Sequence, residues 1–479
     1  MKRQLIGLIA GIGLFAGPFV TPIAHATPTT ELTPASIDAY LDRAMASTGL
    51  PGLSVVVTRG SEIVHAAGYG HDSNGDALTA NSPMRVASLS KSFTAMAVLR
   101  LVDDGRVALD APVAHQLPEF RMADPRASSI TVRQLLNQTS GLSDSTVDIG
   151  ATETAASLRE YVSVLGDGTL AAAPGAEWRY CNANYNVAAR LVEVASGLGF
   201  GEYMRQRIFD PLGMTSSAVS DEKVTPARGF NSIFGVWVAR PELPGFLDDS
   251  GSGGVITTAA DMGHWLISQN GKGTQLVAPR SLEVVHSPQG DHDYGMGWGA
   301  ERLHGADLLL HSGNLFTYNA VQAIDPGTGY GFAVMANSAA LHDDTYDILS
   351  GLVAMSRGVT PEIPGGDRQL FELALALLAA VASVLGILGV WRSRRWASRR
   401  AGRARWRIGI RLLPGLLPLS ILAAYPQLIT VLVNGRTVTW AQLTYFAAPM
   451  TITLVIAAAA GAATAAARAV RLASVGSKA

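Results

Sequence analysis

The stretch Val86-Ala87-Ser88-Leu89-Ser90-Lys91-Ser92-Phe93 opens a long apolar helical pattern and places a serine three residues before a lysine. This spacing is close to one helical turn, so both side chains face one side of a helix. If Ser88 opens the helix, its hydroxyl also lies near free backbone N–H groups and the positive end of the helix dipole. A serine becomes a good nucleophile when a neighbouring base takes its proton, and a lysine in a dry pocket can act as that base. A helix cap followed by a solvated lysine has the same pattern, so the rest of the chain must decide between the two.

The composition limits the classes of function. The chain has 479 residues and a formal net charge of −1, and its mean hydropathy is +0.22. The near-neutral charge and the lack of a basic groove interleaved with aromatic residues argue against nucleic-acid binding. Cys181 is the only cysteine, so no disulfide can form within the chain. The sequence has neither a His-Glu-x-x-His motif nor clustered cysteines, and we expect no metal and no cofactor.

The N-terminus, residues 1–26, has the pattern of an export signal. Lys2 and Arg3 precede an apolar core, and Ala24-His25-Ala26 is a small-x-small cleavage site. An uncleaved anchor is the alternative. In either case the segment that follows is expected outside the cytoplasm.

Residues 33–357 combine strand patterns at both ends with a helical middle. Thr33-Pro34 predicts the start of a helix that ends at Gly49. The stretches with a strand pattern are 53–58, 63–69, 294–298, 306–311, 318–324 and 330–336. The pattern between them is mostly helical over about 113–279. This arrangement predicts an α+β sheet domain with an inserted all-α domain and an active site in the cleft between them.

The C-terminal part has the pattern of a membrane region. A Pro- and Gly-rich linker at 358–369 is followed by three apolar stretches long enough to span a bilayer: 370–390, 412–433 and 443–467. The first is interrupted only by Glu372. An arginine-rich loop separates the first two stretches, and a basic tail covers 468–479. The positive-inside rule places this loop and tail in the cytoplasm, and the domain at 33–357 on the outer side.

A second group of candidate residues is Tyr180-Cys181-Asn182. In extended backbone, Tyr180 and Asn182 point to the same side. A lysine ammonium nearby would lower the pKa of the phenol, so Tyr180 can act as a base toward Ser88 or carry a proton to the leaving group. Asn182 can hydrogen-bond a substrate amide or Lys91. Cys181 points away from both and is expected to be a small buried hydrophobic residue.

The third group is His311-Ser312-Gly313-Asn314, at the end of a predicted strand. Gly313 lets a substrate backbone approach the strand edge. The N–H of Asn314, paired with that of Ser88, can form an oxyanion hole. His311 can orient the substrate or assist proton transfer. An ordinary histidine at a strand end has the same local pattern.

The order of the three groups resembles the serine β-lactamase and penicillin-binding-protein superfamily, in particular its class C branch. The resemblance covers 33–357 and implies a β-lactamase/transpeptidase-like fold with an antiparallel sheet flanked by helices. It implies that Ser88 is acylated and that Lys91 and Tyr180 share its proton, while Asn182 and His311 line the cleft and water releases the acyl group. His-x-Gly resembles the family's esterases and peptidases more than its true β-lactamases, which usually carry Lys-Thr-Gly. The family often has Gly-Thr-Pro-Gly-Phe after this motif, whereas residues 314–318 read Asn-Leu-Phe-Thr-Tyr.

The expected protein is therefore a multi-pass membrane serine hydrolase whose catalytic domain is extracytoplasmic. Its expected partners are the lipid bilayer and a small-molecule or peptide substrate, namely a cell-wall D-amino-acid peptide or a small acyl ester. Two alternatives are open. One is a true β-lactamase, and the other is a non-catalytic sensor or scaffold that binds wall fragments.

Overall fold

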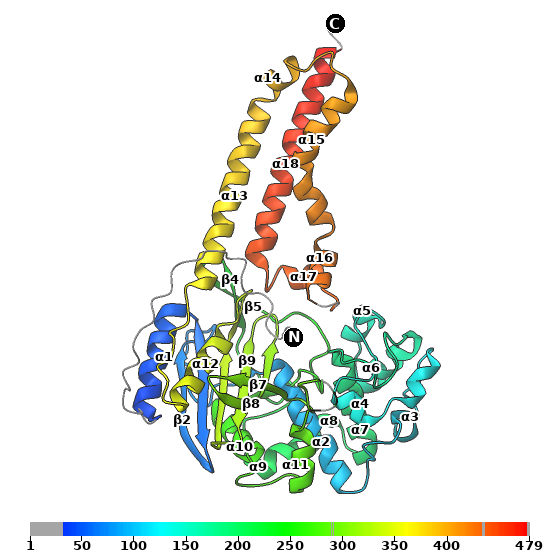
Figure 1. Cartoon of the computed structure of the whole chain (residues 1–479), viewed down its shortest axis with the longest axis vertical. Coiled ribbons are helices and arrows are strands. Elements are labelled where there is room, and N and C mark those ends of the chain that lie inside the picture. The colour runs from blue at the N-terminus through cyan, green and yellow to red at the C-terminus, as the bar shows by residue number, and fades with distance from the viewer. Residues whose placement is uncertain (1–31, 289, 291, 434–435, 477–479) are drawn as a thin grey trace. The chain divides into compact units, whose positions relative to one another are not determined.

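The computed structural model describes residues 32–288, 290, 292–433 and 436–476 (Figure 1). The predicted export signal at 1–26 lies outside the described residues. Contacts divide the chain into two units. The first comprises the described parts of Met1–Phe230 and Ala239–Gly365, and the second comprises those of Asn231–Val238 and Gly366–Ala479.

A six-stranded sheet is the centre of the first unit. Its strands, in spatial order, are β2 (Glu62–Gly70), β1 (Gly52–Arg59), β10 (Tyr330–Ala336), β9 (Asn319–Asp325), β8 (Ala306–Asn314) and β7 (Gly299–Leu303). All neighbouring pairs are antiparallel. The N-terminal hairpin joins the C-terminal strands where β1 pairs with β10, with Val55 opposite Val334. The predicted α+β class, with strands from both ends of the domain in one sheet, is confirmed.

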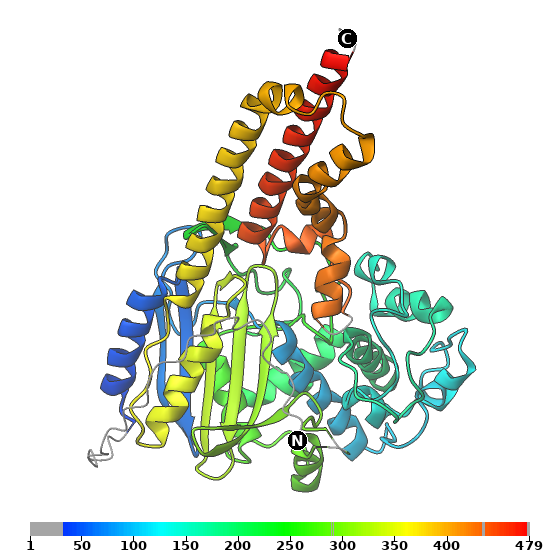
Figure 2. The same ribbon diagram turned by 45° about the horizontal axis from the view of Figure 1, so that its top comes forward.

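Helices cover the sheet because its central strands β9 and β10 are buried on both faces. Every residue of β9 and β10 is buried, which requires packing on each side. Helix α12 (Asp344–Ser356) packs on β9 and β10, and α10 (Ala259–Gln269) packs on β1 and β10. Helix α1 (Pro34–Thr48) adds to the cover over β2 (Figure 2). Thr33 caps α1 and Gly49 follows its last residue, as the sequence predicted.

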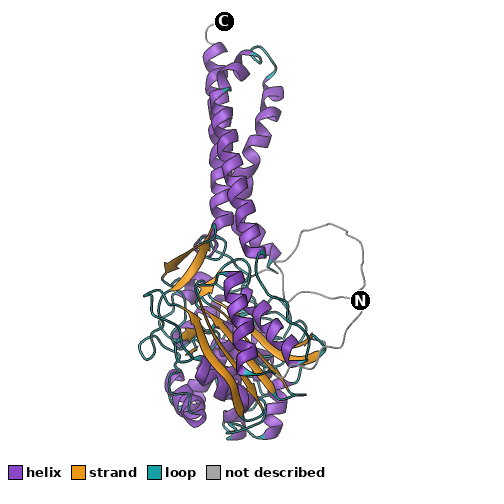
Figure 3. Cartoon of the chain, turned by 90° about the vertical axis from the view of Figure 1, so that its left-hand side faces the viewer, coloured by secondary structure: helices purple, strands orange, loops and turns teal. Residues whose placement is uncertain are grey.

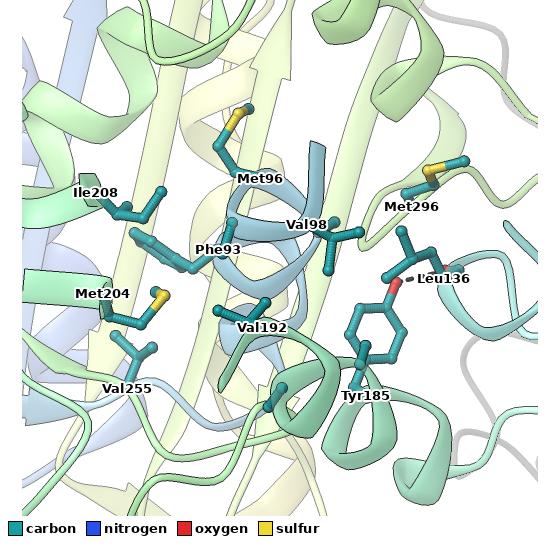
Figure 4. Packing of buried hydrophobic residues seen from close by; sticks show 14 of the residues in the cluster. Phe93, Met96, Val98, Leu136, Tyr185, Val192, Met204, Ile208, Val255 and Met296 are labelled. Carbon is teal, nitrogen blue, oxygen red and sulfur yellow. Dashed lines mark hydrogen bonds between the residues drawn. The ribbon is translucent and has the colours of Figure 1, made fainter. Parts of the chain in front are cut away.

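Helix α2 (Ser90–Asp103) is the central helix of the domain and packs against α7 (Asn182–Ser196). Phe93 of α2 is fully buried. Its ring stacks on Trp265 with centroids 3.8 Å apart and meets the edge of Phe209 at 6.0 Å. Figure 4 shows Phe93 in the buried cluster, near Ile208 and Met204. The other helices of this unit are α3 (Val113–Gln116), α4 (Val132–Leu136), α5 (Ile149–Glu153), α6 (Leu158–Val164), α8 (Phe200–Met204), α9 (Asp210–Leu212) and α11 (Pro279–His286). This packing fixes the start of α2, which carries the Ser-x-x-Lys motif.

Two expectations from the sequence are wrong. Residues 294–298 are not a strand, since β7 begins at Gly299. Gly297 has a φ of +78° and packs so closely on α2 that a Cβ would lie 2.5 Å from Ser92 N, which an extended strand cannot achieve. The region 113–279 is also not all helical. It contains the strands β4 (Gly229–Ile233), β5 (Val236–Arg240) and β6 (Ile256–Thr257).

These strands belong to two small sheets. β6 pairs with β3 (Met84–Arg85), just before the Ser88 turn. β4 lies between β5 and β11 (Ser338–Ala339) in a three-stranded sheet. The outer part of the β4–β5 hairpin, Asn231–Val238, groups with the C-terminal helices.

The second unit is mainly helical (Figure 3). Its helices are α13 (Asp367–Trp391), α14 (Ser393–Ser398), α15 (Arg405–Ala423), α16 (Tyr425–Leu432), α17 (Trp440–Leu443) and α18 (Ala448–Gly476). Helix α18 packs against α13 and α15, and small residues permit close approach where Gly386 meets Ala460. Among the residues that the structure describes, three helical segments are long and apolar enough to cross a membrane: Asp367–Trp391, Trp406–Ala423 and Ala448–Val475. The apolar stretch 412–433 is divided between α15 and α16.

Candidate active site

Ser88 lies in a 3₁₀ turn, Ala87–Leu89, immediately before α2. The sequence suggested that Ser88 would open the α-helix, but the helix begins at Ser90. Ala87 has a φ of +49°, a conformation that non-glycine residues rarely adopt and that is often found at functional sites. The hydroxyl of Ser90 holds this turn, because it donates to Ala87 O at 2.6 Å and accepts from Val255 N at 2.9 Å. The turn therefore presents Ser88 ahead of the helix.

Lys91 is fully buried, and its ammonium group has three oxygen acceptors. Nζ lies 3.0 Å from Ser88 Oγ, 2.9 Å from Asn182 Oδ1 and 2.8 Å from Ser252 O. Each of the three N–H bonds of the ammonium group therefore has one acceptor, and these hydrogen bonds compensate for the loss of water around the buried charge. The structure thus brings the predicted residues Ser88, Lys91 and Asn182 together and adds Ser252, to which the sequence analysis gave no role.

Tyr180 also contacts the serine. Its Oη lies 2.7 Å from Ser88 Oγ, and Lys91 Nζ lies 4.7 Å from the centre of the Tyr180 ring. Ser88 Oγ is therefore within hydrogen-bond reach of both groups that the sequence proposed as its base. The Lys91 ammonium thus also makes a cation–π contact with the Tyr180 ring.

Gln138 holds the segment that carries Tyr180 and Asn182. Its carboxamide oxygen accepts from Cys181 N at 3.0 Å, and its carbonyl accepts from Arg179 N at 2.9 Å. Cys181 is extended, with φ −146° and ψ 126°, and is buried in the core as expected. Extended backbone at this position is the reason that Tyr180 and Asn182 share a side. Gln138 was not predicted, since no pattern in the sequence distinguished it.

His311 of β8 is a buried, neutral imidazole. Its Nδ1 donates to Ser312 O at 2.7 Å, so its Nε2 accepts the hydrogen bond from Tyr294 Oη at 3.1 Å. Burial lowers the pKa of His311 to about 3, with a further contribution from the charge of Lys91. The ring centroid of His311 lies 6.4 Å from that of Tyr180 and 5.8 Å from that of Tyr294. His311 therefore lines the site as a neutral group.

Gly313 allows β8 to run directly against the Ser88 turn. A Cβ at this position would lie 2.3 Å from Val86 O and 3.0 Å from Ser88 N. No side chain fits there, and this contact places the end of β8 beside the N–H group of Ser88. The side chain of Asn314 donates to Asn319 Oδ1 at 3.1 Å and to Asp343 Oδ2 at 3.2 Å. The side chain of Asn314 is thus directed toward β9 and Asp343. The part of Asn314 that bears on the expected oxyanion hole is its backbone N–H.

Two aromatic residues near Tyr180 were missed. The ring of Trp178 lies 6.5 Å from that of Tyr180 and 5.8 Å from that of Tyr294. Trp178 precedes Tyr180 by two residues in a non-helical segment, a spacing that could have identified it. Burial and the neighbouring tyrosines raise the pKa of Tyr294 well above its usual value, so its O–H stays protonated and donates to His311. Among the residues that the structure describes, no group of three His, Cys, Asp or Glu side chains is placed to hold a metal ion.

Comparison with known proteins identifies the family. A family model described as Beta-lactamase matches residues 37–354, about two thirds of the chain. The chain belongs to the beta-lactamase family. Its serine hydrolase fold explains why a Ser-x-x-Lys turn, a Tyr-x-Asn segment and a His-x-Gly strand converge in one place, and the predicted membership is confirmed.

Individual members of the family show how far the similarity extends. Penicillin-binding protein 4 of Amycolatopsis lactamdurans is 29% identical over 353 residues, which cover 68% of this chain and 91% of that protein. Protein flp of Staphylococcus aureus is 26% identical over 317 residues, 63% of this chain, and the chain spans only 62% of the length of that relative. The octameric penicillin-binding protein homologue from Pyrococcus abyssi has the same fold. Its TM-score is 0.60 at 24% identity, over 68% of this chain and 78% of that one.

Proposed function

We propose that this protein is a membrane-anchored, extracytoplasmic serine hydrolase that acts through an acyl-enzyme on an amide or ester. A cell-wall D-amino-acid peptide or a small acyl ester is the proposed substrate class. One observation carries the proposal: Ser88 Oγ lies 3.0 Å from Lys91 Nζ and 2.7 Å from Tyr180 Oη. A hydroxyl that contacts two groups able to exchange protons is the arrangement that nucleophilic catalysis needs. Family membership and the penicillin-binding-protein relatives support the substrate class.

The first step is the activation of Ser88. In the reactive state one member of the Lys91–Tyr180 pair is deprotonated, and that group accepts the serine proton as Oγ attacks the substrate carbonyl. Asn182 Oδ1 and Ser252 O keep the Lys91 nitrogen in place during this transfer, since both accept from it. His311 remains neutral because its pKa is lowered to about 3, so it contributes hydrogen bonding and shape rather than a proton at neutral pH.

The carbonyl oxygen then gains negative charge. In the proposed mechanism the N–H groups of Ser88 and Asn314 stabilise it, and the close contact of Gly313 with the Ser88 turn keeps the two in register. Tyr180 or Lys91 returns the proton to the leaving group, the C–N or C–O bond breaks, and Ser88 carries the acyl group. Water then attacks the ester, with its proton accepted by the same pair, and free Ser88 is restored.

The experiment compares the full chain, in detergent micelles, with Ser88→Ala. The panel contains a D-Ala-D-Ala peptide, p-nitrophenyl esters, a fluorescent penicillin and a chromogenic cephalosporin. We expect peptide or ester turnover that Ser88→Ala abolishes, with slow cephalosporin hydrolysis. Rapid cephalosporin turnover would favour a true β-lactamase. If nothing acylates Ser88 and nothing is turned over, the protein is a binding protein, and the enzymatic proposal fails.

The orientation has a separate test. Nine arginines lie between 392 and 411, which favours the cytoplasm for the loop after α13. A reporter inserted within 394–405 is expected to give a cytoplasmic signal, and one within 434–440 an external signal. The reverse pattern would place the catalytic domain inside the cell and overturn the proposed localisation.

A further inference from the structure

The turn that departs from the family pattern, residues 315–318, is held by a segment far away in sequence. It joins β8 to β9 and begins two residues after Gly313. Tyr318 Oη donates to Ala227 O. The backbone of Gly229, the first residue of β4, lies directly against Thr317, since a Cβ on Gly229 would be 2.1 Å from Thr317 O. Thr317 is fully buried by these contacts.

Glu242 holds the same turn from the other end of the hairpin. It follows β5 by two residues, and its carboxylate accepts three hydrogen bonds from the turn besides one from Leu243 N. Phe316 N donates at 3.0 Å, Thr317 N at 3.2 Å and Thr317 Oγ1 at 2.6 Å. Hydrogen bonds to a charged acceptor are stronger than those between neutral groups, and this set fixes two consecutive amides of the turn. Residues at both ends of the β4–β5 hairpin thus contact the turn at 315–318.

The outer part of the hairpin makes a different set of contacts, with the first two turns of α13. Glu372 Oε2 accepts from Ser232 Oγ at 2.8 Å and from Gly235 N at 2.6 Å. Arg368 Nη1 donates to Ser232 Oγ at 3.0 Å, and the guanidinium lies 4.5 Å from the centre of the Trp237 ring.

These charged groups are among the most buried in the chain. Arg368 is 3% exposed and Glu372 is 4% exposed, and their side chains lie 3.7 Å apart. A buried pair of charges is stable only while its hydrogen-bond partners remain in place, and the hairpin supplies those partners. Glu372 is also the acidic residue that interrupts the first apolar stretch of the sequence. Its burial against Ser232 and Gly235 explains why a carboxylate is tolerated there.

We propose that the β4–β5 hairpin couples α13 to the turn at 315–318, with Glu242 as a positioning residue for that turn. The hairpin backbone is the link: its tip binds Arg368 and Glu372, and its two ends bind Thr317. The consequence for substrate rests on the proposed function. The turn follows the His-x-Gly strand, so its position sets the shape of the acyl side of the site. The membrane helix then has a role in substrate selection besides anchoring.

Amide hydrogen exchange on the full chain in detergent micelles tests the coupling without any substrate. Two variants are compared with the parent: Glu242→Gln, and the double variant Arg368→Met with Glu372→Gln, which leaves no unpaired charge. We expect exchange in the peptide that spans 314–319 to be about tenfold faster or more in both. Exchange in β10 should not change. Glu222→Gln, an exposed glutamate before the hairpin, is the matched control and should resemble the parent.

The outcomes separate the possible failures. If the double variant accelerates exchange only within 231–238, the hairpin does not transmit and the coupling is wrong. If Glu242→Gln leaves 314–319 unchanged, Glu242 is not a positioning residue. Should the double variant fail to fold, Ser232→Ala removes one tip contact and gives the same comparison. These results stand even if the panel above detects no turnover by Ser88.

Kinetics test the substrate consequence. With p-nitrophenyl esters of increasing acyl length, Glu242→Gln is expected to raise KM about tenfold for the long chains and to leave kcat nearly unchanged. Glu242→Asp, which keeps the charge, should restore part of the loss. An equal fall in kcat for every ester would indicate general disruption and overturn the specific role of the turn.

Discussion

Gly313→Ala probes the contact on which the geometry of the site depends. The added Cβ would lie 2.3 Å from Val86 O, whereas ordinary contact begins near 3.4 Å, so β8 and the Ser88 turn must separate by about 1.1 Å (3.4 − 2.3). Neither partner is a flexible side-chain end, because both are backbone. A displacement of about 1 Å at a reacting centre lowers the rate about 100-fold, equivalent to about 2.7 kcal/mol.

The assay is the rate of Ser88 acylation by a p-nitrophenyl ester or a fluorescent penicillin, with thermal melting of the full chain as the folding check. Gly299→Ala is the matched control, because it adds a methyl group to β7 of the same sheet whose nearest contact is an ordinary 3.4 Å to Leu310 O. We expect about 100-fold slower acylation for Gly313→Ala and little change for Gly299→Ala. If Gly313→Ala acylates within about twofold of the parent while it remains folded, β8 does not position the nucleophile, and the reasoning is refuted.

Three further changes test other parts of the molecule. Phe93→Ala removes a ring stacked 3.8 Å from Trp265 and should lower the free energy of unfolding by about 3–5 kcal/mol; an unchanged melting midpoint would contradict its central place in the core. Tyr180→Phe removes the O–H that lies 2.7 Å from Ser88 Oγ and should slow acylation by about 10²–10⁴-fold without a change in melting; a retained rate would leave Lys91 as the sole base. Burial lowers the pKa of His311 to about 3, so below about pH 6.5 the unfolded chain binds a proton that the folded protein does not. Stability should therefore fall by up to about 1.4 kcal/mol per pH unit from about 6.5 downward, and His311→Gln should weaken this dependence in unfolding measured at successive pH values; an equal slope in both proteins would show that His311 is not held neutral.

Local pattern was sufficient for much of the fold. The strand patterns around 53–69 and 306–336 correspond to β1, β2, β8, β9 and β10, because alternating and β-branched apolar residues specify strands through local sterics. It failed at 294–298, where the apolar and aromatic residues have the composition of a strand but the backbone turns at Gly297 to pack on α2. It also missed β4 and β5. β5 has no buried residue, and β4 is buried but short and contains the polar residues Asn231 and Ser232, so neither has the alternating apolar pattern typical of a strand.

The candidate site shows the same division. Ser88, Lys91, Tyr180, Asn182, His311 and Gly313 were all chosen from the sequence, and the structure brings them together; their catalytic roles stay a prediction. Gln138, Ser252 and Tyr294 were not chosen. Gln138 acts through a side-chain amide that binds backbone, Ser252 through its backbone carbonyl, and Tyr294 through a ring that is distant in the sequence. Such contacts have no local sequence pattern.

The opening octapeptide shows where the sequence by itself was enough. The order of its residue types, combined with the two later motifs, indicated the beta-lactamase family and the chemistry to consider, because the candidate nucleophile Ser88 and the candidate base Lys91 lie about one turn apart in the chain. The tertiary structure decided the environment of Lys91. Its third acceptor, Ser252 O, is 161 residues away, and the contact of Gly313 with Ser88 N joins elements from opposite ends of the domain. Contacts of this range depend on how helices and sheet pack together, and periodicity along the chain carries no information about them.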